Sequence, residues 1–478
     1  MHTRGFGVHG VLNESGVTIN TSDPRLRAAL DLVAAELEAE RAADDLPGIS
    51  AAVVLDQDVI WARGWGHASV ERGMLAAPDT VYGVGSITKV FTATMLMQLR
   101  DAGNLHLDDP VAEHVPGFAV KSPFPGSRPI TLRQLVSHTS GLPTEAPLGH
   151  FHTLRFPSGK VMAESLRDVE LLFMPGTRLR YSNLGFAVLG HALERASGTK
   201  YTQYVSERIL QPLGMTSSGF VSDGSQPPDA ATHYRRMLDD GRWAEMFYPE
   251  NIGGLVPSGD LYSSVVDMAR FISLQFRDDS ADANGVLAAG SIKEMHAPVG
   301  LAPDWSGGIG IGWHLTRIGD YTAVSKSGAT FGTTTDAVFL PELRLGMVLF
   351  TNSVAWAPRM TTSSLEILAP VVERCTVTTP PLATKMDPAW STYVGHYTWD
   401  KMRVAVQVKA DEEGLFAVVS GGLVPESPRL IPSGEGRFRL EGSSTPDEMA
   451  RFEADNTGRV TGLWLGPYHF ERVDVTPR

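Results

Sequence analysis

The chain has 478 residues, 42% of them hydrophobic, and a formal net charge of −13. This length exceeds the size at which a single core stops growing, so it predicts one large domain and a smaller one. The acidic balance, with no dense run of lysine or arginine, excludes nucleic acid as an expected partner. The only cysteine, Cys375, excludes an internal disulfide and a cysteine-rich metal site.

Two further patterns are missing from the sequence. No apolar run is long enough to span a membrane, and the first ten residues lack the apolar core of a secretory signal. We therefore expect a cytoplasmic protein with no membrane partner.

The chain opens with a predicted helix and hairpin. Asp23-Pro24 is typical of an N-cap followed by a first-turn proline, and apolar residues at helical spacing from Leu26 to Leu37 mark one face of an amphipathic helix. The β-rich runs 49–55 and 59–65 are separated by a short polar turn, which predicts a β-hairpin.

The segment Ser86-Ile87-Thr88-Lys89 places a hydroxyl and an amine three residues apart, at the start of an apolar helix that Gly103 could end. At a helix N-terminus, free N–H groups and the dipole favour the oxyanion formed when a serine attacks a carbonyl. Burial should lower the pKa of Lys89, so that its neutral form can accept the serine proton. An S-x-x-K pattern is expected by chance about once or twice in such a chain, so alone it indicates only a capped core helix.

The middle of the chain, residues 104–250, mixes helical patterns with long loops of the kind that shape a substrate cleft. Three strands are then predicted over 321–325, 333–340 and 345–351, followed by a helix over 362–374. From these patterns we expect a first domain over residues 1–375, a linker over 376–388 and a second domain over 389–478. Short alternating strands in the last part predict a small antiparallel barrel or sandwich.

Two further segments accompany the first motif. Tyr181-Ser182-Asn183 follows a Pro-Gly turn and precedes an apolar run, so its tyrosine and asparagine should lie where a loop meets a helix. Lys326-Ser327-Gly328-Ala329 ends the predicted strand that begins at Tyr321.

In this order and spacing, S-x-x-K, Y-x-N and K-S-G resemble the serine β-lactamase and penicillin-binding protein superfamily, most closely the class C β-lactamase-like esterases and peptidases. The resemblance spans residues 25–370. It implies an α/β (α+β) fold with an antiparallel sheet between terminal helices and a helical subdomain forming the other wall of the cleft. The C-terminal part resembles the lipocalin-like β-barrel appended to some members, which could cover the cleft or mediate assembly into a homo-oligomer.

The resemblance also implies roles for the motif residues. Ser86 would be the acylated nucleophile, with Lys89 and Tyr181 sharing proton transfer, and which of the two is the base stays open. The charges of Lys89 and Lys326 are expected to lower the pKa of Tyr181. The remaining positions would bind substrate. Asn183 would hold an amide carbonyl, Lys326 and Ser327 would bind a carboxylate, and Gly328 would let the substrate lie close to the strand. The N–H groups of Ser86 and Ala329 would stabilise the oxyanion.

Each residue also has an ordinary structural interpretation. Tyr181 could be a half-buried tyrosine, Asn183 a helix N-cap, and Lys326 a solvated lysine before a Ser-Gly turn. The co-occurrence of three motifs favours the catalytic interpretation.

Lys326 suits a substrate carboxylate, so we expect a small-molecule or peptide amide substrate, with lactams and D-amino-acid peptides as candidates. A carboxylesterase for small acyl esters and a non-catalytic penicillin-binding or sensor protein are the alternatives. No metal or organic cofactor is expected, and the lack of a G-x-S-x-G sequence disfavours an unrelated α/β-hydrolase.

Weaker features have simpler explanations. His138 is expected to be a structural histidine at a helix end, and His150 and His152 loop histidines, because they lack ligand partners at metal-site spacing. The glycine-rich run 307–312 precedes a strand-like segment rather than a helix, which indicates tight sheet packing rather than a dinucleotide loop.

Overall fold

The computed structural model describes residues 11–12, 17–19, 23–237, 241–277, 285–378, 388–399, 404–411, 414–420, 427–434, 436–441 and 449–473. The chain forms two compact units, and the larger one contains Ile19–Thr376. The second contains Val377–Arg478 together with Val11–Thr18, a grouping that no sequence pattern indicated. Within the expected linker, strand β17 (Thr376–Thr378) forms a three-stranded sheet with β1 (Val11–Leu12) and β2 (Val17–Ile19), and residues 379–387 lie outside the described part.

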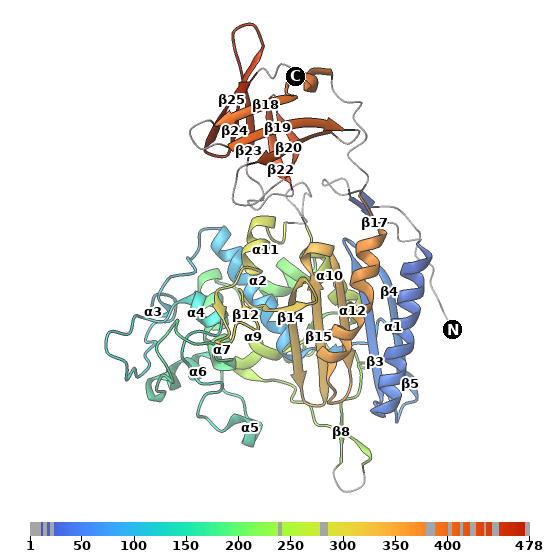
Figure 1. Cartoon of the computed structure of the whole chain (residues 1–478). Helices are drawn as coiled ribbons and strands as arrows, with labels where there is room; N and C mark the ends of the chain where they lie inside the picture. The colour runs from blue at the N-terminus through green and yellow to red at the C-terminus, as the bar shows by residue number, and fades with distance from the viewer. Residues whose placement is uncertain are drawn as a thin grey trace. The chain divides into compact units, whose positions relative to one another are not determined.

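The larger unit is built on a nine-stranded antiparallel sheet (Figure 1). Its strands in spatial order are β11 (Gly300–Leu301), β12 (Gly308–Ile309), β13 (His314–Ile318), β14 (Tyr321–Thr330), β15 (Thr333–Leu340), β16 (Leu345–Thr351), β3 (Gly48–Leu55), β4 (Asp58–Ser69) and β5 (Met74–Leu75). The predicted hairpin and the three predicted strands are confirmed, with the turn between β15 and β16 formed by η6 (Pro341–Leu343).

Strand β3 lies in the middle of the sheet because it pairs with β16 on one side and β4 on the other. All eight of its residues are buried, and successive side chains point to opposite faces. Ala51 and Val53 join one apolar core, whereas Ala52 and Val54 join the other. The central strand therefore contributes to both layers of the unit.

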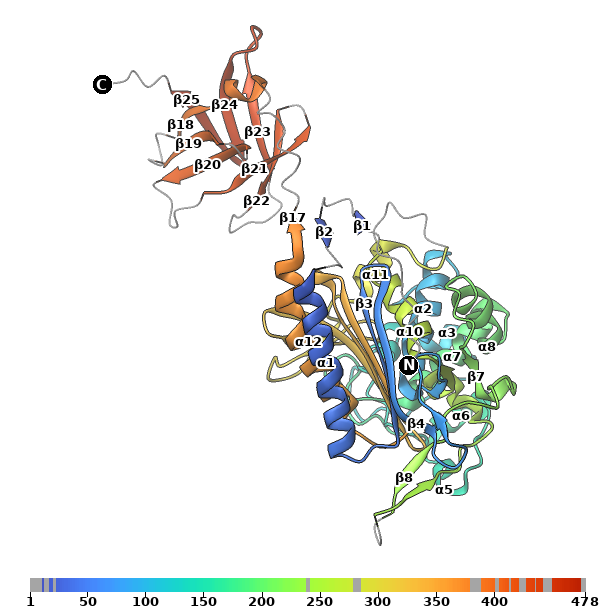
Figure 2. The same ribbon diagram turned by 90° about the vertical axis from the view of Figure 1, so that its right-hand side faces the viewer.

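Helices cover both faces of this sheet (Figure 2). On one face lie α1 (Pro24–Ala43) and α12 (Ala357–Cys375), side by side. Asp23 caps α1 as predicted, through its side chain. Helix α12 begins five residues before the predicted start because Pro358 fits its first turn, where a helix needs no N–H donor.

The other face carries α2 (Thr88–Asp101) and α10 (Val265–Leu274), with α11 (Ala289–Met295) nearby. A helical part beyond them forms the second wall of the cleft. It contains α3 (Val111–His114), α4 (Leu132–Val136), α5 (His150–Thr153), α6 (Gly159–Ser165), η2 (Leu166–Asp168), α7 (Asn183–Ser197), α8 (Tyr201–Val205), η3 (Ser206–Leu210), η5 (Gly253–Leu255) and α9 (Val256–Gly259).

Short strands complete the larger unit. A three-stranded sheet contains β6 (Tyr82–Gly83), β10 (Leu261–Ser263) and β7 (Gly219–Phe220), with η4 (Val221–Asp223) after it. A separate hairpin is formed by β8 (Tyr234–Arg236) and β9 (Trp243–Glu245). The glycines of 307–312 pack closely as predicted, since a Cβ on Gly310 would lie 2.2 Å from the Met295 carbonyl oxygen.

The second unit contains a closed eight-stranded barrel, which confirms the all-β C-terminal prediction. After η7 (Pro388–Thr392), its strands are β18 (Gly395–Trp399), β19 (Val404–Asp411), β20 (Gly414–Ser420), β21 (Arg429–Gly434), β22 (Arg437–Glu441), β23 (Met449–Ala454), β24 (Val460–Leu465) and β25 (Tyr468–Val473). Pairing of β18 with β25 closes the barrel around a core that includes Tyr397, Phe438 and Phe452. None of the helices in the described residues has the length and apolar character to cross a membrane.

Candidate active site

Ser86 lies in η1 (Gly85–Ile87), a single 3-10 turn that leads directly into α2. Gly85 has φ +53°, and a Cβ there would lie 2.6 Å from the carbonyl oxygen of Ala329. The backbone of η1 thus packs directly on β14, and only glycine fits this conformation and contact. The serine therefore sits at the N-terminal end of a buried helix, as predicted.

Lys89 lies one turn after Ser86 and is fully buried. Its Nζ is 3.1 Å from Ser86 Oγ, 2.8 Å from Asn183 Oδ1 and 2.7 Å from the carbonyl oxygen of Ser258. Burial lowers the pKa of Lys89 well below its usual range, and the charge of Lys326 lowers it further. The predicted direction of this shift is confirmed.

The three neighbours of Lys89 Nζ define the geometry of its neutral form. The oxygens of Asn183 and Ser258 can only accept hydrogen bonds, so they take the two N–H groups of a neutral amine. The lone pair is then left for the third neighbour, the Ser86 hydroxyl. This arrangement suits Lys89 to accept the serine proton.

Tyr181 approaches Ser86 from the other side, and its hydroxyl donates to Ser86 Oγ at 2.6 Å. Burial raises the pKa of Tyr181 above its ordinary value, partly offset by the hydrogen bond with Ser86. The prediction that two lysine charges lower this pKa is wrong. Lys89 and Lys326 do lie 4.8 and 5.0 Å from the ring centre, but their own pKa values are lowered by burial, and removal of the phenol from water dominates.

His138 holds Tyr181 in place. Its ring packs against the Tyr181 ring in a tilted arrangement with centres 4.5 Å apart, and its Nδ1 accepts a hydrogen bond from the Ser182 N–H at 3.1 Å. Burial, followed by the charge of Lys326, lowers the pKa of His138 well below its usual value, so the imidazole is neutral. His138 follows α4 directly and is a structural histidine as expected, and the structure places it beside the candidate site.

Asn183 begins α7, but the N-cap is Ser182, whose hydroxyl accepts from the Gly185 N–H. The Asn183 side chain is therefore free for the site. Its Oδ1 faces Lys89, and its Nδ2 donates to Glu145 Oε1. Glu145 was not predicted, because nothing in the sequence distinguishes it from an ordinary loop glutamate.

Lys326 is 1% exposed on β14 and faces the Tyr181 ring. Its Nζ lies 3.4 Å from Nε2 of His314 on the neighbouring strand β13. Burial lowers the pKa of Lys326 to about 7, and the charge of Lys326, followed by burial, lowers the pKa of His314 to about 3. At neutral pH the lysine is therefore partly charged beside a neutral imidazole.

The rest of the K-S-G segment forms the junction with η1. A Cβ on Gly328 would lie 2.0 Å from the Val84 carbonyl oxygen and 3.1 Å from Ser86 N, so only glycine fits there. Ser327 points to the opposite face of the strand, whereas the backbone of Ala329 lies against Gly85. This junction brings together the two segments whose N–H groups are the expected oxyanion donors.

Strand β14 has an open edge beside the serine. Its pairing with β13 ends at Ser325, opposite His314, and no described strand continues along that side from Lys326 to Thr330. On its other side the whole segment stays paired with β15. An extended substrate can therefore lie along this edge as an additional strand.

A cavity of about 280 Å³ opens at Ser86. Its polar end contains Ser86, Asn183 and Ser258, and its apolar walls are formed mainly by Phe151, Phe156, Ile252, Leu255 and Phe331. His150 begins the short helix α5, and its Nε2 is 3.6 Å from Glu145 Oε2. Across the described residues, no group of three or more His, Cys, Asp or Glu side chains forms a possible metal site.

Comparison with known proteins identifies the family of the chain. A family model described as Beta-lactamase matches residues 33–371. The chain belongs to this family. The predicted resemblance to the serine β-lactamase and penicillin-binding protein superfamily and the predicted fold class are therefore confirmed.

Several members of the family are similar over long segments. The chain is 29% identical over 367 residues to the Beta-lactamase-like protein 2 of Dictyostelium discoideum, covering 75% of this chain and 66% of that protein. It is 31% identical over 315 residues to the D-alanyl-D-alanine-carboxypeptidase/endopeptidase AmpH of Escherichia coli (strain K12), covering 63% and 79%. The solved octameric penicillin-binding protein homologue from Pyrococcus abyssi superposes with a TM-score of 0.63 at 25% identity, covering 92% and 99%.

Proposed function

We propose that this protein is a serine hydrolase that cleaves amide bonds through an acyl-enzyme on Ser86. The observation that carries the proposal is the position of Ser86 Oγ, 3.1 Å from Lys89 Nζ and 2.6 Å from the Tyr181 hydroxyl. One group is placed to take a proton and the other to give one. The similarity to AmpH, named as a carboxypeptidase and endopeptidase, supports amide substrates.

In the first half of the reaction, Ser86 Oγ bonds to the carbonyl carbon and its proton moves to neutral Lys89. The oxyanion forms beside the N–H groups of Ser86 and Ala329. As the carbon–nitrogen bond breaks, the leaving nitrogen takes the Tyr181 proton, and the Lys89 ammonium returns its proton to the tyrosine oxygen. The net transfer is one proton from Ser86 to the leaving amine.

In the second half, water replaces the amine. The water oxygen bonds to the acyl carbon, and the water gives a proton to the base, which is Lys89 or Tyr181. The bond between the acyl carbon and Ser86 Oγ then breaks, and Ser86 Oγ regains a proton. A tyrosine that holds its proton at neutral pH is suited to the acid role, which favours Lys89 as the base in acylation.

The finer part of the proposal is a substrate with a free carboxylate on its leaving half. Lys326 supports this, because its amine lies on the strand whose edge borders the serine, and its charge at neutral pH would attract a carboxylate. Ser327 is left out of this contact, because alternation along β14 points its side chain to the opposite face from Lys326. D-Amino-acid peptides and lactams share this feature, and the acyl half would then extend toward Thr330.

The test is intact-mass analysis of the protein over time after mixing with a penicillin, with Ser86→Ala as the control. We expect an adduct on the native protein and none on the variant, and release of D-alanine from N-acetyl-D-alanyl-D-alanine by the native protein. Label on the variant would overturn the nucleophile assignment. A stable adduct without turnover of any amide or ester would favour a sensor, and ester turnover unaffected by Lys326→Ala would favour a carboxylesterase.

We also propose that the chain assembles with copies of itself. The support is the Pyrococcus abyssi homologue, which is described as octameric and is similar along 92% of this chain. Light scattering during size-exclusion chromatography should give a mass that is a multiple of 51.6 kDa. A mass of one chain at micromolar concentration would contradict the proposal.

A further inference from the structure

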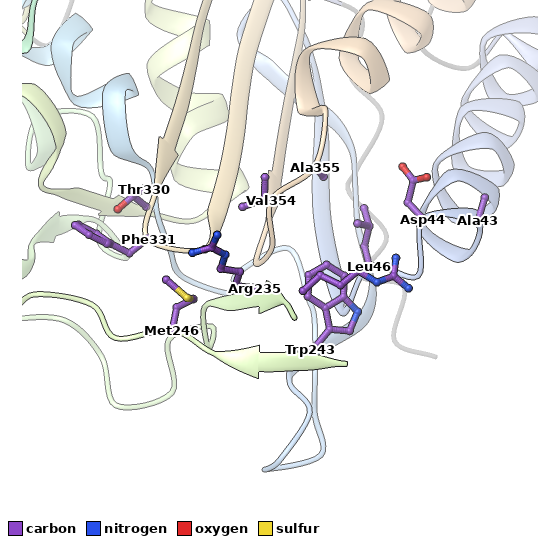
Figure 3. Close-up of a pocket in the computed structure, with 12 residues that line it drawn as sticks. Ala43, Asp44, Leu46, Arg235, Trp243, Met246, Thr330, Phe331, Val354 and Ala355 are labelled. Atoms are coloured by element: carbon purple, nitrogen blue, oxygen red, sulfur yellow. The ribbon is translucent and has the colours of Figure 1, made fainter. Parts of the chain in front are cut away.

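A second cavity, of about 700 Å³, adjoins the catalytic cavity where β14 turns into β15. The two share Thr330 and Phe331. The other walls of the second cavity come from the end of α1, from the β8–β9 hairpin and from residues 354–355 (Figure 3). The residues of these other walls take no part in the proposed acylation or deacylation of Ser86.

Arg235 is the distinctive side chain of this cavity. It is exposed on β8, and it makes no hydrogen bond or ion pair with any part of the chain that the structure describes. Its guanidinium lies on the side of the cavity nearer Phe331 (Figure 3). A guanidinium held at a concave surface without a carboxylate partner is a ready donor for an anionic ligand.

The neighbouring Arg236 already has bonding partners. Arg236 donates to the Gly241 carbonyl at 3.1 Å and to Asp45 at 3.3 Å, and it lies over the Trp243 ring at 5.5 Å. Trp243 is itself fixed, because its Nε1 donates to the Asp45 carbonyl at 2.7 Å. These contacts hold the hairpin against the end of α1 and leave Arg235 as the available cation.

Most of the remaining wall is apolar. Leu46, Met246, Phe331 and Val354 line it, and Val354 is 64% exposed. The carboxylate in the lining, Asp44, lies at the end opposite Phe331 (Figure 3). An anionic group is therefore favoured near Arg235, and an apolar segment beside it.

The direction of the substrate places its acyl half here. Lys326 and Thr330 lie on opposite sides of Ala329 along β14, and the proposed carboxylate of the leaving half lies at Lys326. An acyl group on Ser86 then runs past Ala329 and Thr330, through the apolar catalytic cavity. Because the two cavities share Thr330 and Phe331 in their linings, a longer acyl group can extend into the second one.

We propose that the second cavity is a binding subsite for the far end of the acyl half, and that the preferred substrates carry a carboxylate there, bound by Arg235 beyond an apolar segment. This inference rests on the proposed Ser86 acyl-enzyme. It adds a substrate class that the catalytic cavity alone does not specify.

The experiment uses p-nitrophenyl esters, which report acylation through a common leaving group. One series consists of monoesters of glutaric, suberic and sebacic acid, each with a free carboxylate at the far end of the acyl chain. The matched series carries a methyl ester at that end, and p-nitrophenyl acetate measures the basal reaction. kcat/KM is measured for the native protein, for Arg235→Gln and for Arg128→Gln, which removes one positive charge from an exposed position in the lining of neither cavity.

We expect the native protein to prefer the free acid over its methyl ester by about tenfold at one of the longer lengths, and the preference to fall at high salt. Arg235→Gln should lose this preference and keep the acetate rate, and Arg128→Gln should keep both. Equal rates for acid and methyl ester at every length, or a preference that survives in Arg235→Gln, would overturn the subsite. Absence of Ser86-dependent turnover of every ester, together with absence of a penicillin adduct on Ser86, would overturn the proposed function and the subsite with it.

Discussion

Glu145 accepts a hydrogen bond from the side-chain amide of Asn183, and this contact determines that the oxygen of that amide faces Lys89. Without it, the amide could turn and present two N–H donors to the lysine. Glu145 also acts through its charge, which opposes the lowering of the Lys89 pKa. One loop carboxylate thereby positions a substrate-binding residue and tunes the base.

Glu145→Gln separates these two effects, because glutamine still offers an oxygen to Asn183 but carries no charge. The pKa of Lys89 should fall further, so the rise of the Ser86 acylation rate with pH should move to lower pH. Glu145→Leu removes the contact as well and should slow acylation about tenfold at every pH. Stopped-flow acylation between pH 5 and 9 measures both, with Glu164→Gln at an exposed position of α6 as the control. An unchanged pH profile in Glu145→Gln would refute the electrostatic role.

For substrates that carry a carboxylate, titration of Lys326 should make kcat/KM fall at the alkaline side of the pH profile. Its pKa of about 7 means that the ammonium is present below that pH and lost above it. For N-acetyl-D-alanyl-D-alanine, kcat/KM should fall as pH rises through about 7, because kcat/KM reports the free enzyme. The rate for p-nitrophenyl acetate, which has no carboxylate, should show no such fall. Parallel profiles for the two substrates would show that Lys326 does not bind the carboxylate.

Gly328→Ala should inactivate the protein by separating η1 from β14. The added Cβ would lie 2.0 Å from the Val84 carbonyl oxygen, so the backbone beside Ser86 must move. A displacement of about 1 Å can cost about 100-fold in rate, and we expect a loss of that size in penicillin acylation. The matched control is Gly290→Ala in α11, where a Cβ meets nothing within 4 Å. Equal rates for the two variants would contradict the close contact.

Asp336 on β15 should make the protein less stable as pH rises. It is buried, its Oδ2 accepts from the Thr361 hydroxyl at 2.5 Å, and burial raises its pKa from 3.8 to about 6. The folded protein therefore holds a proton that the unfolded chain releases above pH 4, so stability is lost as pH rises from about 4 through about 6. The cost above pH 7 is about 3 kcal/mol. Asp336→Asn should raise Tm at pH 8 and leave it unchanged at pH 4, as scanning calorimetry would show.

Local patterns predicted much of the fold. The hairpin of β3 and β4 and the run from β14 to β16 each have a clear apolar pattern and a turn between strands, so their positions could be predicted. The insertion of β3 between β16 and β4 could not, because it depends on pairing between opposite ends of the domain. The strand formed by Thr376–Thr378 also escaped prediction, since its partners precede α1.

The candidate site likewise has features that the local sequence predicts and features that depend on tertiary packing. The spacing of Ser86 and Lys89 on a helix is a local property, and the structure confirms that they touch. Glu145, Ser258 and His314 reach the site from loops and a neighbouring strand, and no motif identifies them. The direction of the Tyr181 pKa was predicted wrongly because the depth of burial, which dominates it, is set by tertiary packing.

The pairing of β3 with β16 also bears on how the protein is made. Ile49 pairs with Thr351, so the partner strand is translated about 300 residues after β3. At typical rates of synthesis, the ribosome needs roughly 15–60 s to cover that distance. During this time a strand of eight residues, all buried in the finished protein, has only its hairpin partner β4. The edge of this strand that pairs with β16 is thus among the last in the sheet to find its partner, and until then it can pair with other chains.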